Sequence, residues 1–400
     1  MMLSIVGGVY RERCMRPDWD QVVGSAGRAA MAIHQLGGRV HLHSHLDDQA
    51  RAIFSAVDEL KLTGPAIAHC PAFFYLHGLA RPVIHRIADL ADLELEAEKI
   101  IRFGMLDATA VVKATYAVFD PQNAEGIERF GQNGSTADHL ALVLNRDEAA
   151  RLLDQPDVEP AELAQQLAEH EAAEVVVIKM GPQGALVWHS GAAHQVPAYE
   201  TPFVWKIGSG DQFVAHFAYA WMEEGREPVE AADRASRATA YYCQYRGFPN
   251  QRQLDSYHPD PVEVSDRFKS RVKPPRVYLA GPFFSLGQLW MVDQARDVLR
   301  NMGLTVFSPY HDVGVGPANE VVQQDLDGIA DCDLMFAICD GMDPGTIFEI
   351  GYARRMGMPV IVYAETEGAE ASKMMVGTGC YIRSDFVSAI YQTAWVGAKL

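Results

Sequence analysis

Short apolar runs alternate along this chain with stretches of helical spacing, and this alternation constrains the fold more than any other feature. Val175–Met180, Leu140–Asn145 and Asp333–Cys339 have the length and composition of buried strands. A helical pattern follows the last of these runs, and another extends from Gly208 to Trp221. Repeated strand and helix units of this kind form parallel sheets covered by helices, so the sequence predicts the α/β class.

The length of the chain predicts two domains. It has 400 residues, more than one hydrophobic core usually holds. A polar stretch without periodicity contains Pro259, Pro261, Pro274 and Pro275, which is typical of a linker. We therefore expect a first domain over residues 1–250, a linker over 251–275 and a second domain over 276–400.

The formal net charge of −18 argues against a nucleic-acid partner, because phosphate backbones are bound by basic surfaces. The six cysteines are scattered without a C-x-x-C pair, which indicates reduced thiols. No run of about 18 apolar residues is present, so no membrane segment is expected. These features predict a cytoplasmic protein that acts on a small molecule.

Three carboxylates crowd the segment Asp340–Ala353, which joins a predicted strand to a predicted helix. Asp340, Asp343 and Glu349 would lie at the carboxyl edge of a parallel sheet, where ligands of open α/β folds bind. A structural alternative also exists, because Thr346 and Glu349 have the spacing of a helix capping box.

Ordered motifs in the second domain resemble the nucleoside 2-deoxyribosyltransferase family, which includes nucleoside 5′-monophosphate N-glycosidases. The motifs are YLAGPFFS, Ser308-Pro309, QQDLDGI, DG followed by DPGTIFEIGYA, and PVIVY. The resemblance covers residues 276 to about 390 and implies a small flavodoxin- or Rossmann-like domain with a parallel sheet. It implies no cofactor for this domain, and a homo-oligomer.

The same resemblance implies roles for individual residues. Glu349 would be the nucleophile that attacks the anomeric carbon, Asp325 the acid that protonates the leaving base, and Tyr278 the neighbour that orients the glutamate. Asp343 would contact the 5′ end of the sugar, while Gly281 and Asp340 would contribute to substrate binding. Cleavage of an N-glycosidic bond through an oxocarbenium-like state uses two carboxyl groups in different environments.

The 5′ end of the substrate receives two conflicting signals. Asp343 suits a free 5′-hydroxyl, since a carboxylate repels a phosphate. Ser372, followed by Lys373, falls near the position where the monophosphate hydrolases of the family have a phosphate-binding serine. The spacing of Asp343 to Glu349 is unbroken, so we expect a free nucleoside to be preferred, with the monophosphate as the alternative.

The first domain resembles the ribokinase-like (PfkB) family of sugar and nucleoside kinases, on the motifs Asn145-x-x-Glu148, GPQG and GSGD. The resemblance implies ATP and Mg²⁺ as cofactors and Asp211 as the base that activates the acceptor hydroxyl. Gly208, Ser209 and Gly210 would form an anion hole with their backbone amides. Asn145 and Glu148 would organise Mg²⁺ indirectly, through its waters.

Two departures from the kinase pattern affect the substrate side. Trp205, Lys206 and Ile207 precede the glycine turn where the family usually has Asp-Thr-Thr, and Arg28 replaces its sugar-binding asparagine. The first domain is therefore either an ATP-dependent kinase for an unusual acceptor or a non-catalytic scaffold or nucleotide sensor. The chain as a whole is expected to be an enzyme of nucleoside or nucleotide metabolism.

Overall fold

The chain forms two compact units, Met1–Asp260 and Pro261–Leu400, in a computed structural model that describes residues 2–87, 90–123, 126–270 and 272–400. The stretch 251–275, expected to be a linker, is divided between them. Helix α7 (Gln251–Ser256) belongs to the first unit, where Leu254 is buried against Leu36. Helix α8 (Asp266–Ser270) belongs to the second unit and buries Phe268.

A nine-stranded sheet forms the centre of the first unit, in the order β13-β12-β11-β10-β9-β8-β1-β4-β5. The seven strands from β11 to β5 in that order pair in parallel, and β12 and β13 add an antiparallel edge. The bounds are β1 Met2–Val6, β4 Arg39–His43, β5 Lys61–Thr63, β8 Leu93–Phe103, β9 Ala110–Asp120, β10 Thr136–Asn145, β11 Val175–Lys179, β12 Ala185–His189 and β13 Ala192–Val196.

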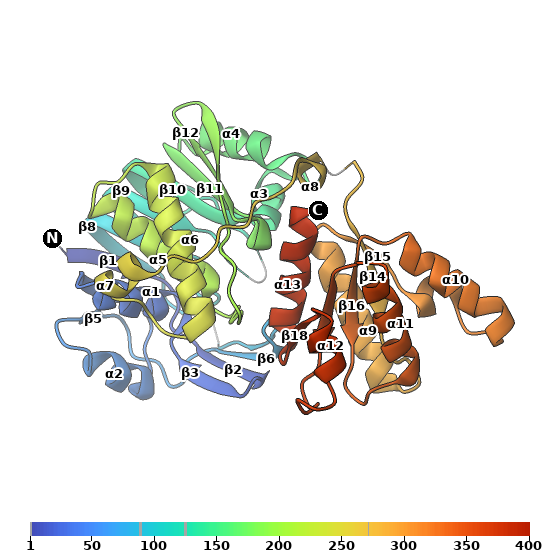
Figure 1. The fold of residues 1–400 in the computed structure, drawn as a ribbon. Helices are drawn as coiled ribbons and strands as arrows, with labels where there is room; N and C mark the ends of the chain where they lie inside the picture. The colour runs from blue at the N-terminus through green and yellow to red at the C-terminus, as the bar shows by residue number, and fades with distance from the viewer. Residues whose placement is uncertain (1, 88–89, 124–125, 271) are drawn as a thin grey trace. The chain divides into compact units, whose positions relative to one another are not determined.

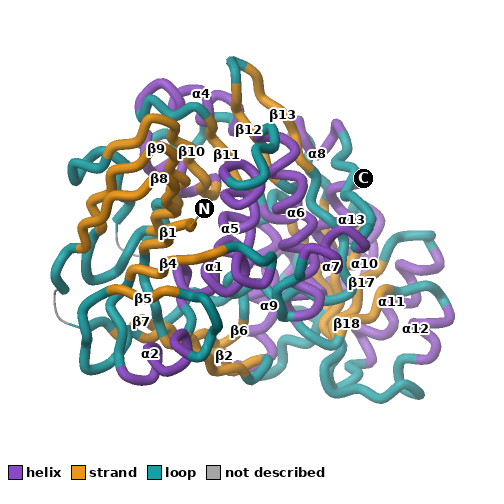
Figure 2. The backbone as a smooth tube through the Cα atoms, turned by 90° about the vertical axis from the view of Figure 1, so that its left-hand side faces the viewer, coloured by secondary structure: helices purple, strands orange, loops and turns teal. Residues whose placement is uncertain are grey.

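Helices cover both faces of this sheet (Figures 1 and 2). One face packs on α1 (Gly24–Gln35), α5 (Ser209–Met222) and α6 (Pro228–Tyr245), with α2 (Asp48–Ser55) beside them. The other face packs on α3 (Arg146–Leu153) and α4 (Pro160–His170). The side chains of the central strands alternate between these two cores, which explains why the buried parts of these strands are continuously apolar.

A second, four-stranded sheet of the first unit was not predicted from the sequence. Its order is β3-β2-β6-β7, and its strands are short. The bounds are β2 Arg11–Arg16, β3 Trp19–Val22, β6 Ala72–His77 and β7 Val83–His85. Strand β2 has an alternating burial pattern, so Glu12 and Cys14 point inward while Arg11 and Arg13 are exposed.

The second unit contains a five-stranded sheet in the order β15-β14-β16-β17-β18, all parallel. Helices α9 and α13 pack together beside this sheet, and α10 packs on α11. From β14 the chain first adds β15 on one side and then β16 on the other, so the order of the strands reverses at β14 and β16. Such a switch point leaves a crevice at the carboxyl ends of the two strands. The bounds are β14 Arg276–Ala280, α9 Leu286–Asn301, β15 Thr305–Phe307, a π-helical turn Pro309–Val313, α10 Ala318–Ala330, β16 Leu334–Ile338, α11 Pro344–Arg355, β17 Val360–Tyr363, α12 Lys373–Gly377, β18 Tyr381–Arg383 and α13 Phe386–Lys399.

The α/β class predicted from the alternation is confirmed in both units. Among the described residues, no helix combines the length and the apolar character that crossing a bilayer requires.

Candidate functional site

Tyr278 and Glu349 meet at the switch point of the five-stranded sheet. Tyr278 lies on β14 and is fully buried, and its hydroxyl donates a hydrogen bond to Oε1 of Glu349 at 2.6 Å. Burial, together with the neighbouring carboxylate of Glu349, raises the pKa of Tyr278 well above its usual value. The tyrosine therefore remains a protonated donor, and it fixes one oxygen of Glu349.

The capping-box alternative for Thr346 and Glu349 is wrong. Helix α11 begins at Pro344, and its N-cap is Asp343, whose Oδ2 accepts from the amide of Thr346 at 2.8 Å and from its hydroxyl at 3.0 Å. Glu349 lies within the helix, and its carboxylate is bonded to Tyr278 instead of a helix-end amide. Proline is favoured at the first position of a helix. With Pro344 there, the cap is Asp343, three residues before the predicted cap Thr346.

The environment of Glu349 strongly perturbs its carboxyl group. Its pKa is raised to about 7, chiefly by burial and also by the charges of Asp325 and Asp343, while the hydrogen bond from Tyr278 acts in the opposite direction. Such a group is partly ionised near neutral pH. Strong perturbation by burial and charge partners in a crevice is typical of functional carboxylates.

Asp325 is a second carboxyl group with an unusual environment. It lies on α10, its Oδ1 is buried, and within the described parts of the chain that atom has no hydrogen-bond partner. Burial raises the pKa of Asp325. A buried carboxyl oxygen without a partner favours the protonated form, which can give its proton to a bound molecule.

The other predicted residues of this site have local contacts. Asp340 accepts hydrogen bonds from the amides of Glu365 and Thr366 and from the Thr366 hydroxyl, so it holds the loop after β17. Gly281 follows β14, and a Cβ atom there would lie 3.1 Å from the Cβ of Ile338. A side chain at 281 would thus crowd the crevice next to the switch point, whereas substrate contact by Asp340 stays a prediction.

Ser372 is at the N-cap position of the short helix α12 but does not cap it, because its hydroxyl instead donates to the carbonyls of Gly368 and Ala369, each at 3.3 Å. Lys373 forms an exposed ion pair with Glu370 at 3.1 Å. Both groups of the proposed phosphate-binding pair are therefore bonded within their own segment.

An aromatic cluster at the same sheet edge was missed by the sequence analysis. Phe283 follows β14 and Tyr310 follows β15, and their ring centroids are 5.4 Å apart. Phe284 extends the cluster, with its centroid 5.3 Å from that of Phe283. The signal was present in the sequence, since the motifs GPFFS and SPYHD both place aromatic rings directly after a strand. These rings offer stacking surfaces for a flat base.

In the first unit, the predicted base Asp211 is held by a buried arginine. Nη1 of Arg28 lies 2.5 Å from Oδ2 of Asp211, and Nη2 of Arg28 is paired with Glu12. Gln122 donates to the other oxygen of Asp211 at 3.0 Å. Glu12 and Asp211 are both more than nine-tenths buried. Arg28, which stands where the kinase family has a sugar-binding asparagine, thus neutralises both buried acids.

The turn that would form the anion hole is bordered by lysines. Gly208 has a left-handed backbone, with φ of 76°, and precedes α5, on which Ser209 and Gly210 lie. The amide of Ser209 donates to the carbonyl of Lys206 at 3.1 Å, while Nζ of Lys206 donates to the Ser209 hydroxyl at 3.0 Å. Burial lowers the pKa of Lys206. Lys179, which sequence analysis did not single out, pairs with Asp120 at 2.7 Å at the end of β11.

Asn145 and Glu148 form a capping box at the start of α3. Oδ1 of Asn145 accepts from the amide of Glu148 at 2.9 Å, and Oε2 of Glu148 accepts from the amide of Asn145 at 2.7 Å. No group of three or more His, Cys, Asp or Glu side chains in the described part of the chain could hold a metal ion. The capping box is a structural role for both residues, and contact with Mg²⁺ through water stays a prediction.

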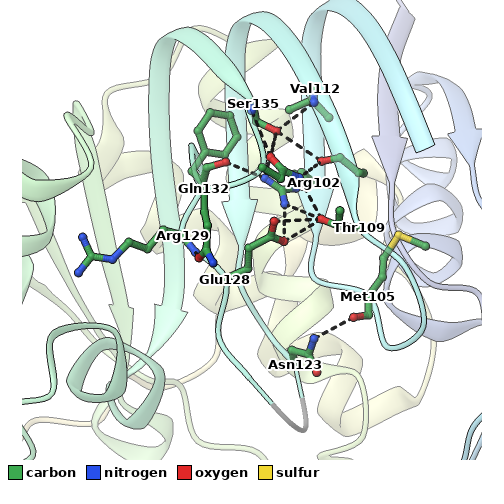
Figure 3. A network of polar contacts seen from close by, with 12 residues as sticks. Arg102, Met105, Thr109, Val112, Asn123, Glu128, Arg129, Gln132 and Ser135 are labelled. Atoms are coloured by element: carbon green, nitrogen blue, oxygen red, sulfur yellow. Dashed lines mark hydrogen bonds and ion pairs between the residues drawn. The ribbon is translucent and has the colours of Figure 1, made fainter. Parts of the chain in front are cut away.

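A buried network holds part of the loop between β9 and β10 against the sheet (Figure 3). Arg102, at the end of β8, donates to the carbonyl of Phe130 at 2.9 Å and to Glu128 at 2.6 Å. Its guanidinium also lies 4.5 Å from the centroid of Phe119. Residues 128–130 of this loop are thus fastened to the sheet. Gln122 has its own restraints, because its amide donates to Asp120 and its side chain donates to Ser25 as well as to Asp211.

Comparisons with known proteins agree with both resemblances. Over 78 residues the chain is 41% identical to 2-dehydro-3-deoxygalactonokinase of Haloferax volcanii, a match that covers 20% of this chain and 24% of the relative. Similar solved structures include a ribokinase of Thermotoga maritima (16% identity, 64% of this chain and 99% of that one, TM-score 0.47) and phosphofructokinase-2 of Escherichia coli (13%, 64% and 98%, 0.47). Residues 136–252 match the pfkB family of carbohydrate kinases, and residues 277–379 match the nucleoside 2-deoxyribosyltransferase family.

Proposed function

We propose that the second unit cleaves or transfers the N-glycosidic bond of a nucleoside, with Glu349 as the nucleophile. The observation that carries this proposal is the 2.6 Å hydrogen bond from Tyr278 to Glu349 at the sheet switch point. It leaves the second oxygen of Glu349 available for attack while the first is held. The family match of residues 277–379 supports the same reaction class.

In the proposed reaction, a carboxylate oxygen of Glu349 bonds to the anomeric carbon as the bond from that carbon to the base nitrogen breaks. The electron pair of the broken bond stays on the base, and Asp325 gives it a proton. Water or a second base then attacks the anomeric carbon, Asp325 takes back a proton, and Glu349 leaves. The raised pKa of Asp325 supports its role as the acid, and ionisation of Glu349 above about pH 7 supports its role as the nucleophile.

The aromatic cluster of Phe283, Phe284 and Tyr310 would stack on the leaving base. Asp343 would bind the 5′-hydroxyl of the sugar. Both hydrogen bonds that the Asp343 side chain accepts within the described structure use Oδ2, so Oδ1 can serve a ligand. We infer that the free nucleoside is preferred to its 5′-monophosphate, because Ser372 and Lys373 already have partners in their own segment.

Base release by the purified protein, followed by chromatography over a panel of nucleosides and 5′-monophosphates, tests this proposal. Glu349→Ala is expected to abolish release of base from every substrate that the wild type cleaves. A 2′-fluoroarabino nucleoside, whose fluorine slows breakdown of the glycosyl ester, should add one sugar to the peptide containing Glu349. Release that survives in Glu349→Ala would exclude this residue as the nucleophile.

For the first unit, the Arg28 ion pair favours a scaffold or nucleotide-sensing role over phosphoryl transfer. A base must accept a proton from its substrate, and Asp211 instead faces a guanidinium at 2.5 Å. ATP would bind with its phosphates at the turn of Gly208, Ser209 and Gly210, beside Lys206. Mg²⁺, held through water by Asn145 and Glu148, would supply charge neutralisation when bound.

ATP-dependent phosphorylation of a panel of sugars and nucleosides distinguishes the two roles. The scaffold role predicts no phosphorylated product with the wild type, while nucleotide binding remains detectable by calorimetry. Product formation that Asp211→Asn removes, with base release unchanged, would establish the kinase role instead.

A second copy of the chain is the partner that we propose for the second unit. Large apolar side chains are exposed around the start of α9 and on α11 and α12, namely Phe284, Leu286, Phe348, Met374 and Val376. Exposed apolar groups in such number are typical of contact surfaces. Sedimentation analysis should find an oligomer that Phe348→Glu weakens, whereas the same change at the exposed Val272 should not.

A further inference from the structure

A cavity of about 620 Å³ lies in the first unit, next to the buried pair of Arg28 and Asp211. It is bounded by β2 and β3 of the small sheet, by α1 and α2, by the segment before α5 and by the end of α6. Its size is in the range of small-molecule sites. Much of its wall is apolar, formed by Trp19, Val23, Met31, Ile53, Trp205 and Phe248.

Two tryptophans contribute to the aromatic part of this wall, together with Tyr242 and Phe248. The rings of Trp19 and Trp205 meet edge to face, with centroids 5.1 Å apart and planes at 62°. Trp205 is anchored in a cluster with Tyr242 and Ile207, so its ring has a fixed position. Rigid aromatic surfaces in a concave site bind flat rings by stacking and by apolar contact.

The cavity also carries a positive charge that nearby acids do not neutralise. Arg246 caps α6 in a left-handed conformation, and its guanidinium carbon lies 4.8 Å from the centroid of Trp205. Within the described residues, no carboxylate is in ion-pair distance of Arg246. By contrast, Arg11 at the same cavity is bound by Asp20 through both oxygens, at 2.9 and 2.7 Å.

This cavity adjoins the Asp211 site through Arg28. Arg28 lines the cavity, but its guanidinium forms ion pairs with Glu12 and Asp211. Asp211 is not among the described residues that line the cavity. A ligand here would therefore contact one side of Arg28 without reaching the carboxylate.

We propose that this cavity binds a small molecule in which a planar aromatic ring is joined to an anionic group. The ring packs against Trp19 and Trp205, and the anion pairs with Arg246. A nucleoside monophosphate and an aromatic carboxylic acid share this chemistry. The proposal stands on the geometry of the first unit alone and does not depend on activity in either unit.

Calorimetric titration of the full chain tests the proposal with AMP, adenosine and indole-3-acetate. At least one of the two anionic probes should bind, and adenosine should bind at least about tenfold more weakly than AMP if AMP is the ligand. Binding of AMP alone identifies a nucleotide site, binding of indole-3-acetate alone identifies an aromatic-acid site, and binding of both establishes the class without selectivity.

Variants connect the binding to this cavity. Arg246→Gln keeps a polar, though shorter, side chain and should weaken binding of the anionic probe about tenfold or more, because it removes the charge. Arg39→Gln, the same change at an exposed position of β4, is the matched control and should have no effect. Trp19→Leu, at a half-buried position, removes part of the aromatic wall and should also weaken binding of the anionic probe. Circular dichroism of this variant checks that it is folded.

Three results would overturn the proposal. The first is no binding of either anionic probe below 1 mM. The second is anionic-probe binding that persists unchanged in both Arg246→Gln and Trp19→Leu, since the probe would then occupy another site. The third is equal affinity for adenosine and AMP together with no binding of indole-3-acetate, because the anion would then contribute nothing.

Discussion

The guanidinium of Arg28 lies flat against Gly208, so that a Cβ atom on Gly208 would fall 2.1 Å from Nε of the arginine. Glycine at 208 thus serves two needs, the left-handed turn before α5 and room for a buried cation. The predicted anion hole and the arginine share one space. Any phosphate acceptor that reached Asp211 would have to displace Arg28 from its two acids.

Removal of that cation should destabilise the first unit. Arg28→Met leaves Glu12 and Asp211 as uncompensated buried acids, which typically costs about 3–5 kcal/mol. We expect a lower melting temperature for the first unit by differential scanning calorimetry. The triple variant Glu12→Gln, Arg28→Met, Asp211→Asn should recover most of the loss, and a single variant as stable as the wild type would contradict the buried ion-pair network.

Glu349→Gln should change how stability depends on pH. The pKa of Glu349 is about 7 in the folded protein, against an ordinary value of 4.5, so the folded state binds this proton more tightly than the unfolded state does. The stabilisation from that proton is complete below about pH 4.5 and is lost as the pH rises through 7. Melting temperatures of the wild type should therefore fall relative to Glu349→Gln between pH 5 and pH 8. A constant difference over this range would show that Glu349 has an ordinary pKa.

Tyr278→Phe should move the pH profile of base release. The Tyr278 hydroxyl lowers the pKa of Glu349, and phenylalanine removes that hydrogen bond while retaining a ring against Phe307, 5.5 Å away between centroids. The acid limb of kcat/KM, expected near pH 7 in the wild type, should shift to higher pH. If Tyr278 had only a structural role, the variant would be less active, but the acid limb of its kcat/KM profile would stay at the pH found for the wild type.

Asp343→Ser should alter selectivity at the 5′ end of the substrate. Serine can cap α11 in place of the aspartate, so the helix start is preserved. The change removes a carboxylate that would repel phosphate. The ratio of kcat/KM for a nucleoside to that for its 5′-monophosphate should fall from a value above one in the wild type. A wild type that prefers the monophosphate would assign phosphate binding to Ser372 and Lys373.

Local sequence patterns predicted much of the fold because each depends on residues close together in the chain. The strand expected at Leu140–Asn145 is β10, and the helix expected from Gly208 to Trp221 is α5, each within a few residues. The cap of α11 could also have been predicted, since Pro344 marks the first helical position.

Contacts between distant segments could not be predicted in this way. Arg28 and Asp211 are 183 residues apart, and no local rule pairs them. The small sheet joins β2 in parallel to β6, some sixty residues later, through strands too short and too polar on one face to give a clear pattern. The cavity walls likewise come from four separate segments, so neither its aromatic lining nor its charge is visible in the sequence.

The attachment of Tyr278 to an interior strand has a consequence for the evolution and redesign of the second unit. β14 is bonded on both sides, to β15 and β16, so it cannot shift without breaking two ladders. The loops that carry Phe283, Tyr310 and Ser372 have no such restraint and can vary in length and composition. New base or sugar preferences should therefore arise by exchange of these loops, with the tyrosine and glutamate inherited as one fixed unit.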